Sequence, residues 1–407
     1  MDKKNSRFFP FLSYNKNLIY LDSAGTTLKP KKVIQAINKY YQNYSINNHS
    51  GGGSSLFNKV QKTIQATRKI IAQTINSQSE EIIFFPSTTY SLNILALSLD
   101  NRLKEGDKIC LTYLEHSSNL YPWEAIIQRK KLQLSFLPLD RSFTIDIEKL
   151  DEIIDKKTKI VSFFHTSNSL GSTNSVSKIA KKIKELSPNC LIIIDACQSV
   201  AHSPIDVKEW NIDALVFSGH KVYGPTGIGV LWIKKELAEK MPHILWGGGK
   251  KASPSEKIDN NLPLSQKFEV GTLPLAQIFG LKASFEFLNN LEIEAINKNE
   301  KELKDHFLKI VRKLKEVIIY NQGSETTNII LFNLKDFHPH DVSEYLQKNN
   351  IYVRAGNFCC PYLDKAIKKE SAIRISLAIY NTKKDINKLV KCLENLIKNP
   401  NLIVDIF

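Results

Sequence analysis

Short apolar runs that end in polar residues, each followed by a helical pattern, recur along the chain. They occupy residues 81–85, 108–112, 159–164 and 191–195. A run that is apolar at nearly every position is typical of a strand covered on both faces, and the alternation of such strands with helices indicates a mostly parallel sheet. The sequence therefore predicts an α/β fold built on a doubly wound, mostly parallel sheet.

The pattern divides the chain into three parts. Its 407 residues are enough for two or three domains. We expect an N-terminal arm at residues 1–17 and a large domain at residues 18–275 that contains the parallel sheet. Two long helical patterns then lead into short strands and a final helix, which predicts a linking helix and a smaller α+β C-terminal domain at residues 276–407.

The composition excludes several classes of protein. With 42% hydrophobic and 24% charged residues, the chain can bury a normal core and is not of the disordered type. No apolar run is long enough to span a membrane, the N-terminus lacks a signal-peptide pattern, and the six cysteines lack zinc-site spacing. We therefore expect a cytoplasmic protein with reduced cysteines, no membrane association and no metal site.

The net charge of +15 makes nucleic acid a partner class to consider. The lysines are spread over many segments, however, and form no dense basic block. Solvated helix faces explain this distribution better than a nucleic-acid arm does. A basic nucleic-acid-binding protein is therefore kept only as a remote alternative, which salt-sensitive binding of RNA or DNA would support.

One lysine, Lys221, stands at the end of a further apolar run at residues 213–217, in the sequence Ser-Gly-His-Lys. Open α/β sheets bind their ligands at the carboxyl ends of the strands. A lysine that is desolvated there can lose its proton and react with a carbonyl compound. The alternative is a solvated lysine after a strand, and the residues at the other strand ends favour the reactive one.

Polar residues also follow the other predicted strands. They are Thr88 and Thr89, His116, Asn168, and Asp195 with Gln198. Because the carboxyl ends of parallel strands meet at one edge of a sheet, we expect these residues to lie close to Lys221. A buried Asp195 carboxylate needs a cationic partner, such as a protonated pyridine ring, and hydroxyl groups at a helix N-terminus can hold a phosphate. An amine, an acid, a histidine and a phosphate cradle together suit pyridoxal 5'-phosphate.

These motifs give the chain a likeness to a known family. It resembles the class V aminotransferases, which are pyridoxal phosphate enzymes of fold type I, and within them it is most similar to the cysteine desulfurases of the SufS type. The likeness covers about residues 18–398 and includes the sequences DxxQ at 195–198 and FSGHK at 217–221. Other matching stretches lie at residues 20–24, 115–123, 167–171, 268–272, 353–359 and 374–381. The resemblance implies a seven-stranded sheet in the large domain.

The resemblance also implies how the cofactor would be held. Lys221 would bind pyridoxal phosphate covalently and move the substrate proton. Asp195 would pair with the pyridine nitrogen, Gln198 with the ring hydroxyl, and His116 would stack on the ring. The phosphate would be held by Thr88, Thr89, Ser218 and His220, together with Thr272 from the second subunit of a homodimer.

The implied reaction converts L-cysteine to L-alanine. Asn168 and Arg374 would bind the substrate carboxylate, with Arg354 close by, because an arginine fits a carboxylate as a planar two-pronged donor. Cys359 would be the nucleophile that takes the sulfur as a persulfide, and it reacts as the thiolate. The sulfur would then pass to a small acceptor protein or an iron–sulfur scaffold protein, feeding cluster assembly or thiolation.

Two loops depart from the family pattern. His49 is a candidate for substrate binding, with a loop histidine that has no role at the site as an equal alternative. The residues after it are Ser-Gly-Gly-Gly, at 50–53, where the family usually carries an arginine and a second histidine. In the other loop, Ser117 stands where a second histidine usually follows His116.

The nucleophile and the substrate leave alternatives open. Cys360 directly follows Cys359 and could share or replace its role, although the spacing from Arg354 favours Cys359. The same cofactor site would also suit a selenocysteine lyase or another class V enzyme of the aminotransferase type. The sulfur acceptor leaves no motif in the sequence by which it can be named.

Overall fold

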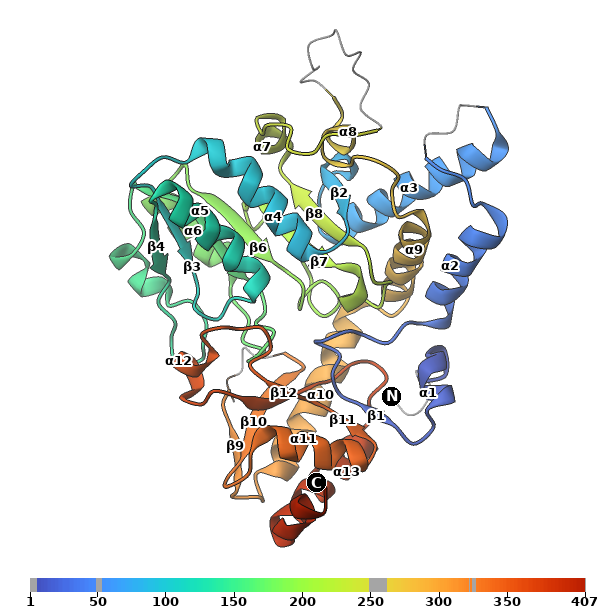
Figure 1. Cartoon of the computed structure of the whole chain (residues 1–407), viewed down its shortest axis with the longest axis vertical. Helices are drawn as coiled ribbons and strands as arrows, with labels where there is room; N and C mark the ends of the chain where they lie inside the picture. The colour runs from blue at the N-terminus through green and yellow to red at the C-terminus, as the bar shows by residue number, and fades with distance from the viewer. Residues whose placement is uncertain (1–5, 49–52, 249–261, 322, 324–326, 407) are drawn as a thin grey trace.

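The protein contains two main sheets, each with its own covering helices. The computed structural model describes residues 6–48, 53–248, 262–321, 323 and 327–406. Figure 1 shows the larger sheet with helices on both faces in the upper half of the view, and the smaller sheet with its helices below it. Both chain ends lie in the lower half, beside the smaller sheet.

The central sheet contains seven strands in the spatial order β2-β8-β7-β6-β5-β3-β4. They are β2 (Ile82–Phe85), β3 (Lys108–Leu111), β4 (Gln133–Phe136), β5 (Thr158–Phe164), β6 (Leu191–Asp195), β7 (Ala214–Ser218) and β8 (Gly229–Ile233). Strand β8 is antiparallel to its neighbours β2 and β7, and the remaining pairs are parallel. The predicted α/β fold with a mostly parallel, doubly wound sheet is therefore confirmed.

Side chains of the central strands alternate between two apolar cores, one on each face. In β2, Ile82 and Phe84 belong to one core and Ile83 and Phe85 to the other. The first core packs against α3 (Ser55–Thr74), α6 (Val176–Leu186) and α9 (Leu275–Asn289), and α9 is covered in turn by α2 (Lys31–Asn43). The second packs against α4 (Thr88–Leu99), α5 (Tyr121–Lys130), α7 (Lys235–Glu239) and α8 (Leu264–Phe268). Burial on both faces explains the apolar runs of the sequence.

The register of the parallel strands places their carboxyl ends side by side along one edge of the sheet. Phe164 at the end of β5 pairs with Asp195 at the end of β6, and Asp195 pairs with Val216 in β7. The loops that follow these strands therefore leave the sheet along one edge. This is the edge at which open α/β sheets bind ligands.

The smaller sheet is antiparallel and has the strand order β12-β13-β10-β9. Its strands are β9 (Val317–Ile319), β10 (Ile329–Leu334), β12 (Arg354–Gly356) and β13 (Ala372–Ser376). Its helices are α10 (Ile293–Val311), α11 (Pro339–Lys348), α12 (Leu363–Ile367) and α13 (Lys383–Lys398). None of the helices within the described residues combines the length and the apolar character that crossing a membrane requires.

The segment that follows the expected N-terminal arm lies against C-terminal elements and outside the central sheet. It forms β1 (Ile19–Tyr20), which pairs in parallel with β11 (Ile351–Tyr352). Asp22 then bridges to Ser376 at the end of β13. The beginning and the end of the chain therefore share one layer, whereas the domain boundaries proposed from the sequence stay a prediction.

The residues before β1 pack onto the protein through one aromatic side chain. The expected N-terminal arm contains the short helix α1 (Pro10–Tyr14). Phe9, directly before it, is fully buried, and its ring centroid lies 4.9 Å from that of Tyr380. Edge-on aromatic contacts of this kind add to the stability gained from burial alone. Part of the arm is therefore anchored in the apolar core.

Gly229 at the start of β8 allows α4 to begin close to the sheet. A Cβ atom at this position would lie 2.5 Å from the carbonyl carbon of Ser87 and 2.9 Å from the amide nitrogen of Thr88. We predict that Gly229→Ala lowers the free energy of unfolding by about 1–3 kcal/mol, because backbone atoms must shift to admit the methyl group. Urea unfolding measures the loss. Gly248→Ala is the control, since a Cβ there meets nothing within 4 Å; equal effects of the two changes would contradict the prediction.

Candidate active site

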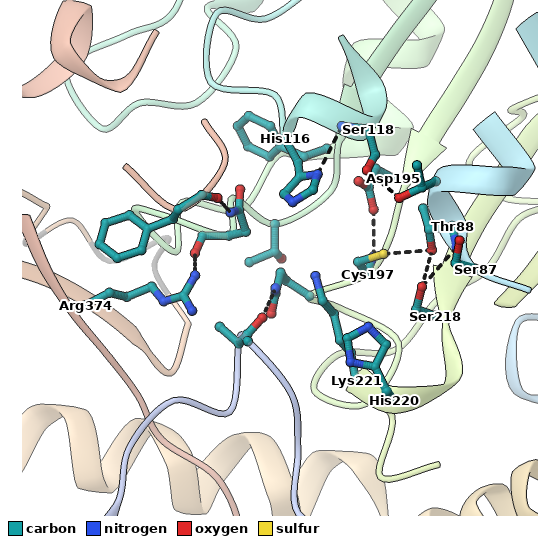
Figure 2. Close-up of a pocket in the computed structure, with 18 of the residues that line it drawn as sticks. Ser87, Thr88, His116, Ser118, Asp195, Cys197, Ser218, His220, Lys221 and Arg374 are labelled. Carbon is teal, nitrogen blue, oxygen red and sulfur yellow. Dashed lines mark hydrogen bonds between the residues drawn. The ribbon is translucent and has the colours of Figure 1, made fainter. Parts of the chain in front are cut away.

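A cavity opens where the loops after the central strands meet the N-terminus of α4 (Figure 2). The site residues predicted from the sequence that line it are Thr88, Thr89, His116, Asn168, Asp195, Gln198, Ser218, His220, Lys221, Arg354 and Arg374. The structure thus brings together side chains from seven separate stretches of the chain. It places them at one site but leaves their individual roles as predictions.

Two predicted site residues are not in the cavity wall, and a third cannot be placed. Cys359 lies on an exposed position of the turn after β12, directly beside Phe358, which does line the cavity. Thr272 is exposed on the loop before α9. His49 falls outside the described residues.

Several residues of the cavity wall were not predicted from the sequence. They are Ala24, Gly25, Ser87, Ser118, Phe164, Thr166, Cys197 and Phe358. Ser87 and Cys197 directly adjoin a predicted residue, and Ser118, Phe164 and Thr166 lie within four positions of one, so the strand-end rule marks their neighbourhood but not the side chain that faces the cavity. Phe358 adjoins the predicted Cys359 but follows a strand of the antiparallel sheet, where the strand-end rule does not apply.

A cluster of hydroxyl groups fixes the start of α4 against β7. Thr88 Oγ1 lies 2.8 Å from Ser218 Oγ and 3.0 Å from Cys197 Sγ, and the Thr88 amide donates to Ser218 Oγ at 3.0 Å. Ser87 caps the helix by accepting a hydrogen bond of 3.2 Å from the Tyr90 amide. The positive end of the helix dipole and several hydroxyl groups therefore meet at the cavity, an arrangement that favours an anion such as a phosphate.

Asp195 and His116 present an acid and a neutral imidazole to the cavity (Figure 2). Asp195 is buried at the end of β6, and its Oδ1 accepts a hydrogen bond of 2.9 Å from the Cys197 amide. Burial and then the positive charge of Lys221 lower the pKa of His116 to about 4, so its ring is neutral at neutral pH. Its Nδ1 accepts a hydrogen bond of 3.1 Å from the Ser118 amide, which leaves the proton on Nε2.

The residue before Lys221 is clamped by the loop after β1. The His220 carbonyl accepts hydrogen bonds from the Thr27 amide and Thr27 Oγ1, both at 3.0 Å. It also accepts from Thr26 Oγ1 at 3.2 Å and from Lys29 Nζ at 3.0 Å. Burial lowers the pKa of Lys29 to about 7 and that of His220 to about 4. This clamp fixes the backbone from which Lys221 reaches into the cavity, and the sequence analysis did not identify it.

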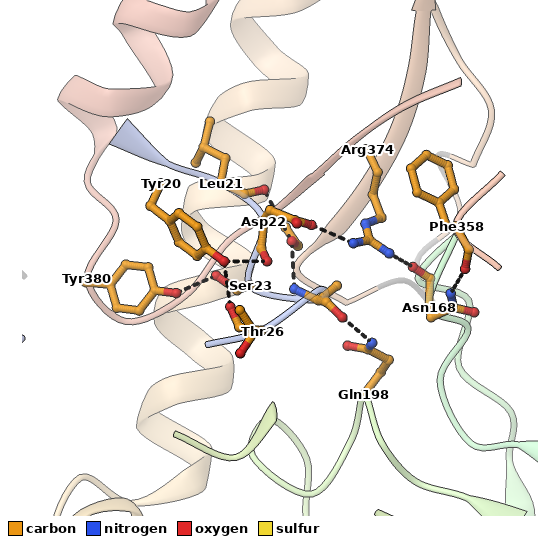
Figure 3. A network of polar contacts seen from close by, with 12 residues as sticks. Tyr20, Leu21, Asp22, Ser23, Thr26, Asn168, Gln198, Phe358, Arg374 and Tyr380 are labelled. Carbon is orange, nitrogen blue, oxygen red and sulfur yellow. Dashed lines mark hydrogen bonds and ion pairs between the residues drawn. The ribbon is translucent and has the colours of Figure 1, made fainter. Parts of the chain in front are cut away.

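Arg374 closes the other side of the cavity and is 1% exposed. Its Nη2 donates to Asp22 Oδ1 at 2.6 Å, and its Nη1 donates to the Asn168 carbonyl at 2.8 Å (Figure 3). Asp22 follows β1 and Asn168 follows β5. One side chain of β13 therefore contacts loops that follow strands of the two other sheets. Gln198, below it in Figure 3, donates to the Ala24 carbonyl at 2.9 Å.

A buried polar network supports the loop that carries His116. Glu115 is 1% exposed and accepts hydrogen bonds from Thr112 Oγ1 at 2.6 Å and from Asn119 Nδ2 at 2.7 Å. Asn119 Oδ1 accepts in turn from Trp123 Nε1 at 3.1 Å and Ser162 Oγ at 2.6 Å. Burial raises the pKa of Glu115 to about 8. The network joins the ends of β3 and β5 to the start of α5.

Comparison with known proteins identifies the family to which this arrangement belongs. A family model described as aminotransferase class-V matches residues 19–389. The chain belongs to the class V aminotransferase family. As the sequence resemblance implied, enzymes of this family depend on pyridoxal phosphate.

Relatives within the class V family are cysteine desulfurases. A probable cysteine desulfurase of Ureaplasma parvum is 36% identical over 97% of this chain and 98% of that protein. One of Halalkalibacterium halodurans is 38% identical over 95% of this chain and 96% of that protein. The solved apo structure of a cysteine desulfurase from Thermococcus onnurineus NA1 shares 32% identity, covers 98% of this chain and 99% of that chain, and has a TM-score of 0.91. The predicted family and enzyme class are therefore confirmed.

The raised pKa of Glu115 predicts a pH-dependent contribution to stability. The unfolded chain releases the Glu115 proton near pH 4.5, whereas the folded protein keeps it until about pH 8. The stability that this proton contributes is therefore complete below about pH 4.5 and is lost as the pH rises to about 8. As the pH rises through this window, we expect the free energy of unfolding of the wild type to fall relative to that of Glu115→Gln. The fall should be on the order of 1 kcal/mol per pH unit. Urea unfolding of both proteins at several pH values tests this. A difference that does not change with pH would contradict it.

Proposed function

We propose that the protein is a pyridoxal phosphate-dependent cysteine desulfurase, which converts L-cysteine to L-alanine and takes the sulfur as a persulfide on Cys359. The observation that carries the proposal is one cavity that combines the Lys221 amine, the buried Asp195 carboxylate and the hydroxyl cluster of α4. An exposed cysteine lies on the turn beside this cavity. The names of the relatives support the same reaction.

The groups around the cavity fit pyridoxal phosphate in their chemistry. Asp195 suits a protonated pyridine nitrogen, the hydroxyl groups of Thr88 and Ser218 at the helix N-terminus suit a phosphate, and the neutral ring of His116 suits the flat face of an aromatic cofactor. When bound, pyridoxal phosphate supplies an electron sink for the carbon that loses its proton. The protein's part is to bind, orient and move protons.

Lys221 and Arg374 have different roles toward the substrate amino acid, namely proton transfer and carboxylate binding. Lys221 would hold the cofactor at rest, and its free amine would take the proton from the substrate Cα. Arg374 and Asn168 orient the substrate carboxylate, since a guanidinium and an amide N–H both donate to carboxylate oxygens. Phe358 lines the same cavity, so the turn with Cys359 borders the space in which the substrate would bind.

Exposure supports Cys359 over Cys360 as the nucleophile. Cys359 is exposed, whereas Cys360 is fully buried and its burial raises the pKa of the thiol to about 12. A thiolate is the attacking form. In the transfer step, Cys359 Sγ forms a bond to the substrate sulfur while the substrate's Cβ–S bond breaks. The electron pair of that bond stays with the carbon skeleton, which takes up protons and leaves as L-alanine.

We further infer a homodimer in the cytoplasm that passes its sulfur to a small acceptor or iron–sulfur scaffold protein. Thr272 is exposed and does not line the cavity of its own chain, so it is accessible to a second subunit. Cys359 is exposed as well, so an acceptor thiol can reach a persulfide formed on it. Sedimentation of the purified protein tests the dimer, and persulfide-transfer partners can be captured from a cell extract without added reductant.

The cofactor assignment predicts a coloured protein. Purified in the presence of pyridoxal phosphate, the wild type is expected to show a visible absorption band, and Lys221→Ala is expected to lose it because the covalent link is gone. Absorption spectroscopy after removal of unbound cofactor measures this. The control is Lys181→Ala on the exposed face of α6, which should keep the band. A colourless wild type contradicts the proposed function.

The nucleophile assignment predicts different effects of the two cysteines. Cys359→Ser is expected to abolish persulfide formation from L-cysteine, while Cys360→Ser keeps it, because a buried thiol with a raised pKa cannot supply a thiolate. Mass spectrometry of the protein after incubation with L-cysteine reads this out. The reverse result would assign the role to Cys360. A wild-type preference for L-selenocysteine, measured as alanine release, would favour a selenocysteine lyase.

A further inference from the structure

Phe358 contacts both side chains that are expected to bind the substrate carboxylate. Its ring lies over the Arg374 guanidinium, with 4.8 Å between the ring centroid and Cζ. Its carbonyl oxygen accepts a hydrogen bond of 2.8 Å from Asn168 Nδ2 (Figure 3). Phe358 is 3% exposed, so these contacts are shielded from water. One residue of the chain therefore engages both groups before any substrate does.

The turn at residues 357–360, called the cysteine turn below, has an unfavourable backbone. Phe358 and Cys359 have φ angles of 59° and 56°, in the left-handed region that residues with side chains rarely adopt. The Cys359 carbonyl is held by Ser117, whose amide donates at 2.7 Å and whose Oγ donates at 3.0 Å. Because two consecutive residues are strained, the cysteine turn depends on its contacts with the rest of the cavity wall.

Arg374 can accommodate a further acceptor. Its Nε is buried and has no hydrogen-bond partner among the described residues, while its Nη atoms contact Asp22 and Asn168. A carboxylate forms charge-assisted hydrogen bonds with a guanidinium, which are roughly twice as strong as hydrogen bonds between neutral groups, and a neutral ring face offers no such bond. A substrate carboxylate is therefore able to displace Phe358 from both of its partners.

We propose that Phe358 is a positioning residue that couples binding of the substrate carboxylate to movement of Cys359. The inference rests on the proposed function. While Phe358 occupies Asn168 and Arg374, the adjoining peptide keeps Cys359 in the cysteine turn. When the substrate carboxylate takes these partners, the strained turn is released and Cys359 can approach the substrate sulfur. The coupling restricts sulfur transfer to amino acids with a free carboxylate.

Amide hydrogen exchange of the pyridoxal phosphate-loaded protein, followed by mass spectrometry, tests the coupling. L-alanine carries the carboxylate but no transferable sulfur, and L-alaninamide is its match without the carboxylate. We expect saturating L-alanine to speed exchange severalfold in peptides that cover residues 354–363, because the amides of Cys359 and Cys360 lose their bonds to Asn357. L-alaninamide should leave exchange unchanged. Unchanged or slower exchange with L-alanine overturns the proposal.

Substitution of Phe358 gives a second, independent measurement. Phe358→Leu and Phe358→Ala remove the ring from Arg374, so we expect L-alanine to bind about threefold or more tightly, as read from titration of the visible spectrum. If Phe358→Ala does not fold, the affinity of Phe358→Leu for L-alanine decides the test. Ile367→Ala, in the same apolar cluster but outside the cavity wall, is the control and should not change the affinity. Equal or weaker binding by both folded Phe358 variants overturns the proposal.

The visible spectrum separates failure of this inference from failure of the proposed function. A wild-type protein that takes up no pyridoxal phosphate overturns the proposed function, and this inference with it. A protein that binds the cofactor, and whose spectrum responds to L-alanine while the cysteine turn does not, overturns this inference alone.

Discussion

A buried guanidinium joins the two sheets of the protein. Arg374 extends from β13 and is 1% exposed, so its charge has to be met by groups inside the structure. Asp22 after β1 and the Asn168 carbonyl after β5 provide those groups. Each comes from a different layer, and an unpaired charge at this depth is costly. The placement of the smaller sheet over the cavity therefore depends on this set of contacts.

Burial also determines which basic groups around the cavity are charged at neutral pH. It lowers the pKa values of His116 and His220 to about 4, so both imidazoles are neutral at neutral pH. An arginine keeps its charge under the same conditions. The cavity thus combines neutral rings with permanently charged guanidinium groups. That combination suits an aromatic ligand with a phosphate at one end and an amino acid carboxylate at the other.

The central sheet and most of the cavity could be predicted because both follow from local patterns. Strands buried on two faces are apolar throughout, and the residues that end them, such as Asp195 and Lys221, share one edge. Strand β4 was missed because an edge strand needs no apolar run, and its Gln133 is exposed. The clamp by Lys29 and the hydrogen bond from Asn168 to Phe358 join residues about 190 positions apart, and no spacing rule reports such contacts.

The pairing of the chain's beginning with its end has a consequence for biosynthesis. Asp22 and Ser23 reach their partners Arg374 and Tyr380 across 352 and 357 residues. On the ribosome, this segment emerges long before its partners do, and contacts between such distant residues form slowly. Ala24 and Gly25, which follow this segment, line the cavity. A nascent chain can assemble its central sheet early, but the pocket is completed only after residues 374–380 have been synthesised.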